Sequence, residues 1–81
     1  MKIYVTGGIA EEMKTPDFGQ FVAESLRRHL CGEWGDVSAE DRESNDNDRE
    51  NALSTYNAPA GRKIWIEQTG DIVIVLFPEE Y

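Results

Sequence analysis

The feature that most constrains the fold is the run Ile-Val-Ile-Val-Leu-Phe at residues 72–77. Its β-branched content, the Gly-Asp pair before it and the proline after it predict a strand. Side chains alternate between the two faces of a strand. The two sets are Ile72, Ile74 and Leu76 on one face and Val73, Val75 and Phe77 on the other. A strand covered on one face alone would alternate apolar with polar residues, so we expect both faces to be covered in part.

A helix that can cover one of these faces begins at Thr15-Pro16-Asp17. Asp17 can cap this helix, and Gln20 stands at the spacing of a capping box. The following residues at helical spacing form a single stripe: Phe18, Phe21, Val22, Ser25, Leu26 and His29. Gly32 suits the left-handed position just beyond the helix end.

The rest of the chain predicts three more strands and a short second helix. Strands are expected at residues 2–6, 52–56 and 63–68, with Gly7-Gly8 ending the first. Residues 9–14 are open to two readings, a loop or a frayed turn. Ser38-Ala-Glu-Asp41 is a capping signal for the second helix, which ends near residues 45–48 because no apolar stripe supports it. Whether the whole acidic segment 40–51 is helical or a mobile loop stays open.

These elements predict a single α+β domain spanning residues 1–81. Its core is a three- to four-stranded antiparallel sheet, packed by one amphipathic helix and the short second helix. The turns at residues 57–61 and 69–71 are short, which makes the last three strands an antiparallel meander. An apolar content of 40% is enough for one small core.

Composition narrows the function classes. The 81 residues carry eight basic and sixteen acidic side chains, a net charge of −8 and a pI near 4.4. Such a field repels phosphate backbones, which argues against direct nucleic-acid binding. One cysteine cannot form an internal disulfide and fits a reducing cytoplasm. No apolar run reaches the ~20 residues of a membrane span, so we expect a cytoplasmic protein without membrane contact.

A tight corner around Trp34 precedes the acidic segment. Gly32 and Gly35 bracket Glu33 and Trp34, which places a large ring where the backbone must bend sharply. Trp34 is either a plug for this corner or a platform for a ligand. A buried indole N–H needs an acceptor, and Asp36 is close enough in sequence to supply one.

The second face of the sheet is a candidate for association. We expect it to receive Tyr4, Trp65 or Tyr56 from the neighbouring strands. The polar second helix cannot cover it well, so Trp34 is expected to close part of it. Any remainder is available to a second copy of the chain or to a partner.

The acidic segment after the corner is the other candidate surface. With Trp34, the candidate binding residues are Asp36, Glu40, Asp41, Glu43, Asp46 and Asp48. Solubility alone explains such charge in many proteins. The functional readings are contact with a basic protein surface, or mimicry of nucleic acid in which carboxylates stand for phosphates.

No motif indicates catalysis or a cofactor. His29 and Cys31 lie two residues apart with acidic neighbours, but structural zinc sites need four ligands, and the alternative makes His29 a helix-end cation and Cys31 a small core residue. Asn45-Asp-Asn-Asp48 lacks the glycine and glutamate of a calcium loop. No carboxylate has an apolar setting, no serine lies in a nucleophile motif, and no phosphate-binding loop is present. We therefore expect no metal, no cofactor and no enzyme activity.

The last two-thirds of the chain carry an ordered set of segments. They are Gly32-Glu-Trp-Gly-Asp-Val-Ser-Ala-Glu-Asp-Arg-Glu-Ser-Asn-Asp46, Leu53-Ser-Thr-Tyr56, Gly61-Arg-Lys-Ile-Trp-Ile66 and Leu76-Phe-Pro-Glu-Glu-Tyr81. This combination resembles a family of small, uncharacterised bacterial proteins carried on plasmids and other mobile elements. The chain is shorter than the family pattern between Asn45 and Leu53 and in the hairpin at residues 68–71. The family has no established activity, so the resemblance implies a context and not a mechanism.

The sequence thus predicts a non-enzymatic interaction protein of a bacterial mobile element. It would bind an unidentified protein partner through the acidic surface or the second sheet face, with a homodimer through the sheet as a further option. The first alternative is an acidic mimic of nucleic acid that inhibits a DNA-binding or restriction factor. A small metal-dependent enzyme is the last alternative.

Overall fold

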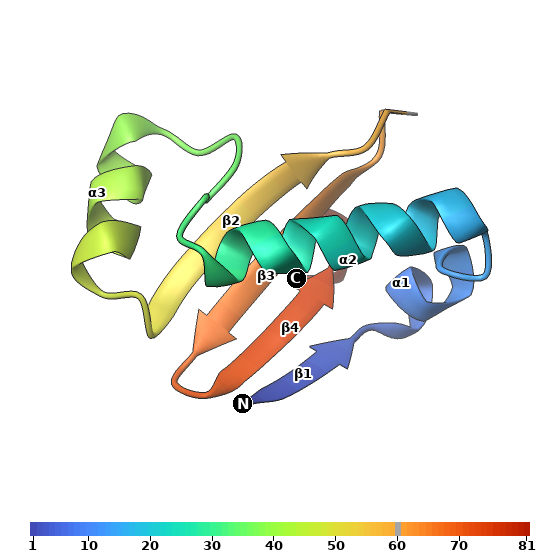
Figure 1. Cartoon of the computed structure of the whole chain (residues 1–81), viewed down its shortest axis with the longest axis horizontal. Coiled ribbons are helices and arrows are strands. Elements are labelled where there is room, and N and C mark those ends of the chain that lie inside the picture. The colour runs from blue at the N-terminus through green and yellow to red at the C-terminus, as the bar shows by residue number, and fades with distance from the viewer. Residues whose placement is uncertain (60) are drawn as a thin grey trace.

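The computed structural model describes residues 1–59 and 61–81, which form a four-stranded sheet with helices on one face and beyond one edge (Figure 1). The strands are β1 (Lys2–Val5), β2 (Asn51–Asn57), β3 (Lys63–Thr69) and β4 (Ile72–Leu76), in the spatial order β1-β4-β3-β2. β4 is therefore an interior strand, as its apolar run predicts. The sheet and the helices together make the α+β fold class that the sequence predicts.

The direction of β1 corrects the antiparallel prediction. β2, β3 and β4 form the expected antiparallel meander, but β1 runs parallel to β4, so the sheet is mixed. A parallel pair needs a long crossover connection, and here everything between Val5 and Ile72 serves as that connection. The pattern within a short strand does not encode its direction, which is why the sequence alone missed it.

Helix α2 (Pro16–Leu30) lies across one face of the sheet, as Figure 1 shows. The predicted stripe faces inward, with Val22, Ser25 and His29 buried and the other members half-buried. It packs on a core formed by Ile9, Val22, Tyr56, Ile64, Ile66, Val73, Val75 and Phe77. Gly32 has a φ of 79°, as expected just beyond a helix. The expected cap at Asp17 is wrong, because the helix begins at Pro16 and Asp17 lies in its first turn.

A short helix, α1 (Gly7–Glu12), follows β1 directly. The sequence left this region as a loop or frayed turn, because two glycines favour turns. The Thr6 hydroxyl supplies the missing start signal, since it accepts a hydrogen bond from the Ile9 N–H at 3.4 Å. Ile9 is fully buried in the core, which anchors α1.

Helix α3 (Ala39–Asn47) lies beyond the outer edge of β2 (Figure 1). Ser38 caps it as predicted, with its hydroxyl accepting from the Asp41 N–H at 3.1 Å. The helix ends within the predicted range, and Asn45 is its one buried residue. No helix among the described residues is long and apolar enough to cross a membrane.

The second face of the sheet carries Ile72, Ile74 and Leu76, as the alternation predicts, with Val73 and Val75 under α2. The cover differs from the prediction. Tyr81, which follows the 3-10 turn Pro78–Glu80, packs edge-on against Trp65 with ring centroids 5.5 Å apart. Trp34 is not on this face, and Tyr56 lies in the core under α2. The border nearest β1 stays open, with Tyr4 52% and Ile72 39% exposed.

Candidate functional site

The Trp34 corner closes the outer edge of β2. The Thr55 N–H donates to the Trp34 carbonyl at 3.1 Å, and the Asp36 N–H donates to the Thr55 carbonyl at 2.8 Å. Gly35 lies between them with a φ of 79°, and an added Cβ would come within 2.0 Å of the Thr55 carbonyl oxygen. Only glycine fits this close approach of two backbones.

The Asn45 side chain continues this closure along β2. Its Nδ2 donates to the Leu53 carbonyl at 2.9 Å, and its Oδ1 accepts from the Leu53 N–H at 3.3 Å. A side-chain amide thus takes the place of a neighbouring strand, and it holds α3 against the sheet. The sequence gives no signal for this role of Asn45, because a lone asparagine on a helix without an apolar stripe forms no recognisable pattern.

Trp34 itself is a buried plug. Its ring is 4% exposed and stands edge-on to His29, with centroids 5.3 Å apart. The predicted acceptor for its N–H is wrong: Nε1 donates to Asp46 Oδ1 at 2.8 Å, one residue before the end of α3. Asp36 instead accepts from Asn57 Nδ2 at 3.3 Å. The indole is therefore used to fix α3 to the corner.

His29 is a neutral core residue, which corrects the prediction of a helix-end cation. It is 2% exposed, with Nδ1 2.5 Å from Ser54 Oγ and Nε2 2.8 Å from Gln68 Oε1. Gln68 donates its own amide N–H to the Gly70 carbonyl, so its oxygen faces His29 and accepts from Nε2–H. Nδ1 is then the acceptor for the Ser54 hydroxyl. Burial lowers the pKa of His29, and the hydrogen bond to Gln68 opposes this only in part.

The predicted role of Cys31 as a core residue is also wrong, because its side chain is exposed. Among residues 1–59 and 61–81, no group of three or more potential ligands is arranged to hold a metal ion.

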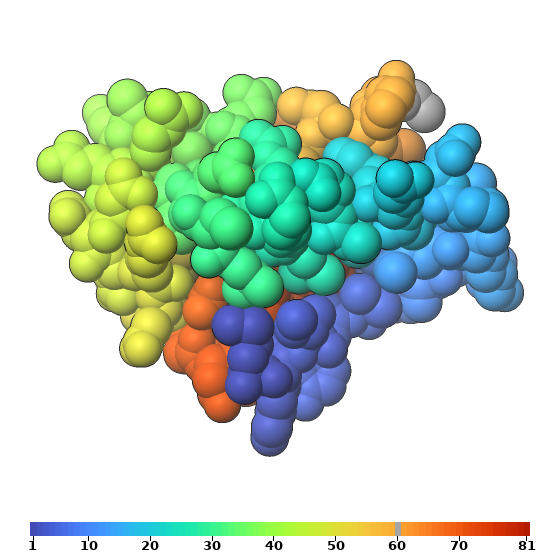
Figure 2. All heavy atoms as spheres, in the orientation of Figure 1, coloured from blue at the N-terminus to red at the C-terminus, as the bar shows by residue number. Residues whose placement is uncertain are grey.

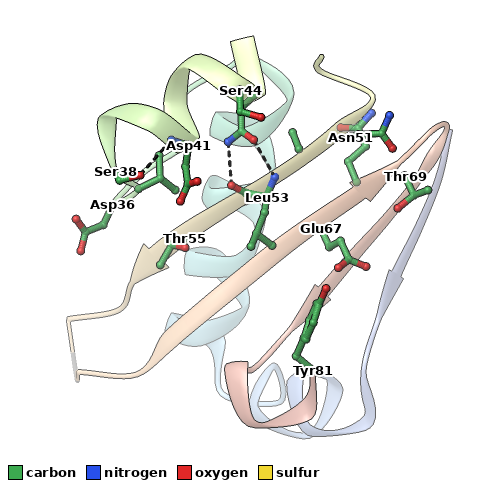
Figure 3. A pocket seen from close by; sticks show the side chains of 14 residues that line it. Asp36, Ser38, Asp41, Ser44, Asn51, Leu53, Thr55, Glu67, Thr69 and Tyr81 are labelled. Atoms are coloured by element: carbon green, nitrogen blue, oxygen red, sulfur yellow. Dashed lines mark hydrogen bonds between the residues drawn. The ribbon is translucent and has the colours of Figure 1, made fainter. Parts of the chain in front are cut away.

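A groove of about 400 Å³ runs between α3 and the second face of the sheet (Figure 3). Asp41 points into the groove from α3. Glu67 lines it from β3, and Tyr81 lines it from the end of the chain, after the 3-10 turn. Its carboxylates are Asp36, Asp41 and Glu67, and its hydroxyls are Ser38, Ser44, Thr55, Thr69 and Tyr81. Leu53 supplies an apolar patch on the floor. The walls are held in place by the Asn45 and Trp34 contacts described above.

The charge of the groove is one-sided. None of its lining residues is basic, and none of its three carboxylates forms an ion pair among the described residues. The described ion pairs lie elsewhere: on α1 and α2, between α2 and Glu33, and between Arg62 and both Glu12 and Glu79. The groove therefore presents unneutralised negative charge beside hydroxyls and an apolar floor.

The predicted acidic residues divide into three sets. Asp36 and Asp41 line the groove, while Glu40 and Glu43 are exposed on α3 outside it. Asp46 binds Trp34, and Asp48 accepts from Asn51 Nδ2 at 3.0 Å, so both carboxylates hold structure.

Glu67, the third carboxylate of the groove, is not among the binding residues predicted from the sequence. Its signal was available in the alternation of β3, which puts Glu67 on the same face as Trp65.

A second hollow of about 650 Å³ lies between α2 and the β2–β3 connection. Its described lining is largely apolar, with Phe18, Phe21 and Pro59 prominent. Its basic residue, Arg62, lies over the Phe77 ring at 4.0 Å and pairs with Glu12 at 3.4 Å. Because this charge is already paired, the acidic groove is the better candidate for recognition.

The fold and groove define a small α+β protein with a mixed sheet and an acidic groove at one edge. The chain matches no family model, no curated protein and no solved structure.

Proposed function

We propose that this chain is a cytoplasmic, non-enzymatic interaction protein of a bacterial mobile element, and that it binds a basic segment of a protein partner in the groove between α3 and the sheet. The carboxylates of Asp41 and Glu67 at a groove whose lining includes no basic residue among the described ones carry this proposal, and Asp36 adds negative charge at its rim. The mobile-element context comes from the resemblance of the signature segments. The groove also joins the two surfaces that the sequence suggested, the acidic segment and the second sheet face.

Charge and shape favour a lysine- or arginine-rich segment. Carboxylates recognise guanidinium and ammonium groups, and hydroxyls accept from their remaining N–H donors. The aliphatic stems of such side chains pack on apolar surface, which Leu53 and the ring of Tyr81 provide. The net charge of −8 draws a basic partner toward the protein.

Removing the groove charges tests this proposal. We expect Asp41→Asn with Glu67→Gln to weaken binding of a labelled hexa-arginine peptide about tenfold, because each partly exposed charge pair contributes about 0.5–1 kcal/mol. The measurement is fluorescence anisotropy at physiological ionic strength, where charges farther apart than about 8 Å are largely screened. The matched control is Glu40→Gln with Glu43→Gln, which removes the same charge from α3 outside the groove and is expected to change the affinity by no more than about twofold. Equal losses in the two variants would show that only the net charge matters.

The nucleic-acid mimic has less geometric support. Such a mimic needs regularly spaced carboxylates that are free to replace phosphates, but Asp46 and Asp48 are engaged by Trp34 and Asn51. A mimic would also rely on Glu40 and Glu43, so the control variant separates the two proposals. A metal-dependent enzyme has no supporting cluster among the described residues.

A further inference from the structure

The two edges of the sheet are treated differently by the fold. The outer edge of β2 is closed by the Trp34 corner and by Asn45, whereas β1 is the outermost strand on the other side. Figure 2 shows the side chains of β1 forming a free border of the molecule. Open edges invite pairing with another strand, and folded proteins usually protect them.

The backbone of β1 offers a defined set of hydrogen-bonding groups. The Lys2 N–H donates to the Asp71 carbonyl at 2.8 Å, and the Thr6 N–H donates to the Val75 carbonyl at 3.1 Å. In a parallel ladder the N–H and C=O of one residue face the same neighbour, and alternate residues face opposite sides. The even-numbered residues therefore bind β4, while Ile3 and Val5 direct their N–H and C=O groups outward.

The same border is apolar. Met1, Ile3, Tyr4 and Val5 are all exposed, with Ile3 at 47%, and Ile72 on β4 is exposed beside Lys2. These account for most of the large apolar side chains that the described surface exposes, and they gather along the β1 edge, with Ile3 and Val5 on one face of the sheet and Tyr4 and Ile72 on the other. Lys2 is the one charged side chain on the strand.

We propose that β1 pairs antiparallel with β1 of a second copy of the chain about a two-fold axis, which joins the two sheets into one of eight strands. The register follows from the outward groups. If Ile3 lies opposite Val5 of the second copy, each residue exchanges two hydrogen bonds, giving four across the axis. Tyr4 then faces Tyr4 of the second copy on the axis, in a pair that makes no backbone hydrogen bonds. This goes beyond the proposed function, because it rests on the other edge of the sheet.

Charge favours a second copy as the occupant. The register places Lys2 opposite Thr6 of the second copy, whose hydroxyl donates to Glu80 Oε1 at 2.6 Å. Hydrogen bonds from Thr6 and the Phe77 N–H lower the pKa of Glu80, so its carboxylate stands ionised within reach of the lysine. The axis repeats this pair, which makes the border complementary to itself.

The remaining negative charge does not oppose the dimer. α3 lies beyond β2, at the far edge from β1 (Figure 1). In an eight-stranded sheet the two α3 helices are separated by about seven strand spacings, roughly 30 Å or more. That is several times the Debye length of about 8 Å at physiological ionic strength, so their repulsion is screened. A four-residue strand pair is a small interface, and we expect a dissociation constant on the order of tens of micromolar.

Sedimentation equilibrium over a range of concentrations tests the association. The wild-type chain should show a monomer–dimer equilibrium, and Val5→Pro should be monomeric throughout. Proline at this position removes only an outward N–H and leaves the pairing with β4 intact, as tolerated on edge strands. Far-UV circular dichroism confirms that the variant is folded. A wild-type chain that stays monomeric at submillimolar concentration, or a folded Val5→Pro variant that still dimerises, overturns the proposal.

Oxidative cross-linking tests the register. In a Cys31→Ser background, Tyr4→Cys should form a disulfide-linked dimer, because the residues on the axis have Cα atoms about 4.5 Å apart. Ile72→Cys is the matched control on the same face, one strand further from the axis, and should stay uncross-linked. The proposed register is overturned if Ile72→Cys cross-links as fast as Tyr4→Cys. It is also overturned if neither variant cross-links although the wild-type chain is dimeric.

Discussion

At the scale of single residues, buried polar side chains form hydrogen bonds with side chains on other helices and strands. His29 on α2 binds Ser54 on β2 and Gln68 on β3, and Trp34 binds Asp46 on α3. None of the buried side-chain nitrogen or oxygen atoms in the described residues lacks a partner. Because an unpaired buried polar group costs about 1–3 kcal/mol, these pairs select one arrangement of the helices on the sheet.

The burial of His29 leads us to expect that the stability of the protein depends on pH. Burial lowers the folded-state pKa of His29 below its usual value near 6.5, so the unfolded chain binds this proton more readily than the folded chain. The free energy of unfolding should therefore fall as the pH drops below about 6.5, by up to about 1.4 kcal/mol per pH unit until the folded pKa is reached. Urea denaturation between pH 7.5 and about 5 measures this slope.

The matched variant is His29→Gln, which keeps a polar side chain but does not titrate. It should be less stable at pH 7.5 and should lose the slope below about pH 6.5. The lowered pKa values of Glu24 and Glu80 affect stability only at more acidic pH, as the pH falls from the usual carboxylate pKa of 4.5 toward the lowered value. An unchanged slope in His29→Gln would contradict the assignment of His29 as a buried neutral group.

At the scale of elements, the closed edge of β2 depends on the approach of the Trp34 corner. We expect Gly35→Ala to destabilise the protein by more than about 3 kcal/mol, because its Cβ would meet the Thr55 carbonyl oxygen at 2.0 Å. Gly61→Ala is the control. Gly61 also has a positive φ, 88°, but nothing lies within 4 Å of its added Cβ, so only a backbone cost of about 1 kcal/mol is expected. Chemical denaturation compares the two, and equal losses would mean that the contact at Thr55 does not constrain the corner.

Elements set by local patterns were predictable from the sequence. The two-faced run of β4, the stripe of α2 and the Ser38 cap of α3 each depend on residues within a few positions of one another. The parallel pairing of β1 and the Asn45 contact with Leu53 depend on residues brought together only by folding. For this reason the fold class was predicted correctly, but the direction of one strand was not.

The residues of the candidate groove were also predictable only where they belong to a local sequence pattern. The acidic segment that contributes Asp36 and Asp41 was visible as a charge cluster. Glu67 was not, because its place beside that segment comes from the pairing of β3 with β2. Asp46 and Asp48 were predicted as binding residues on charge alone, and only the structure shows that their carboxylates contact Trp34 and Asn51.

At the scale of the whole molecule, the sheet separates two kinds of surface. The β2 edge carries α3, the groove and much of the negative charge, while the β1 edge is apolar and open. α2 covers one face between them, and Tyr81 covers part of the other by packing on Trp65. On the two proposals made above, a basic partner and a second copy of the chain would occupy opposite edges of the sheet and would not compete.

The most direct test of the groove is a titration of the ¹⁵N-labelled protein with the hexa-arginine peptide, followed by backbone amide chemical shifts. If the groove is the binding site, the shifts should concentrate on Asp41, Leu53, Thr55 and Glu67, which lie on α3, β2 and β3. The outer residues of α3, Glu40 and Glu43, should move little, and so should β1. Shifts spread evenly over all acidic residues, or centred on Glu40 and Glu43 with the groove silent, would contradict the proposal that this groove recognises a basic segment.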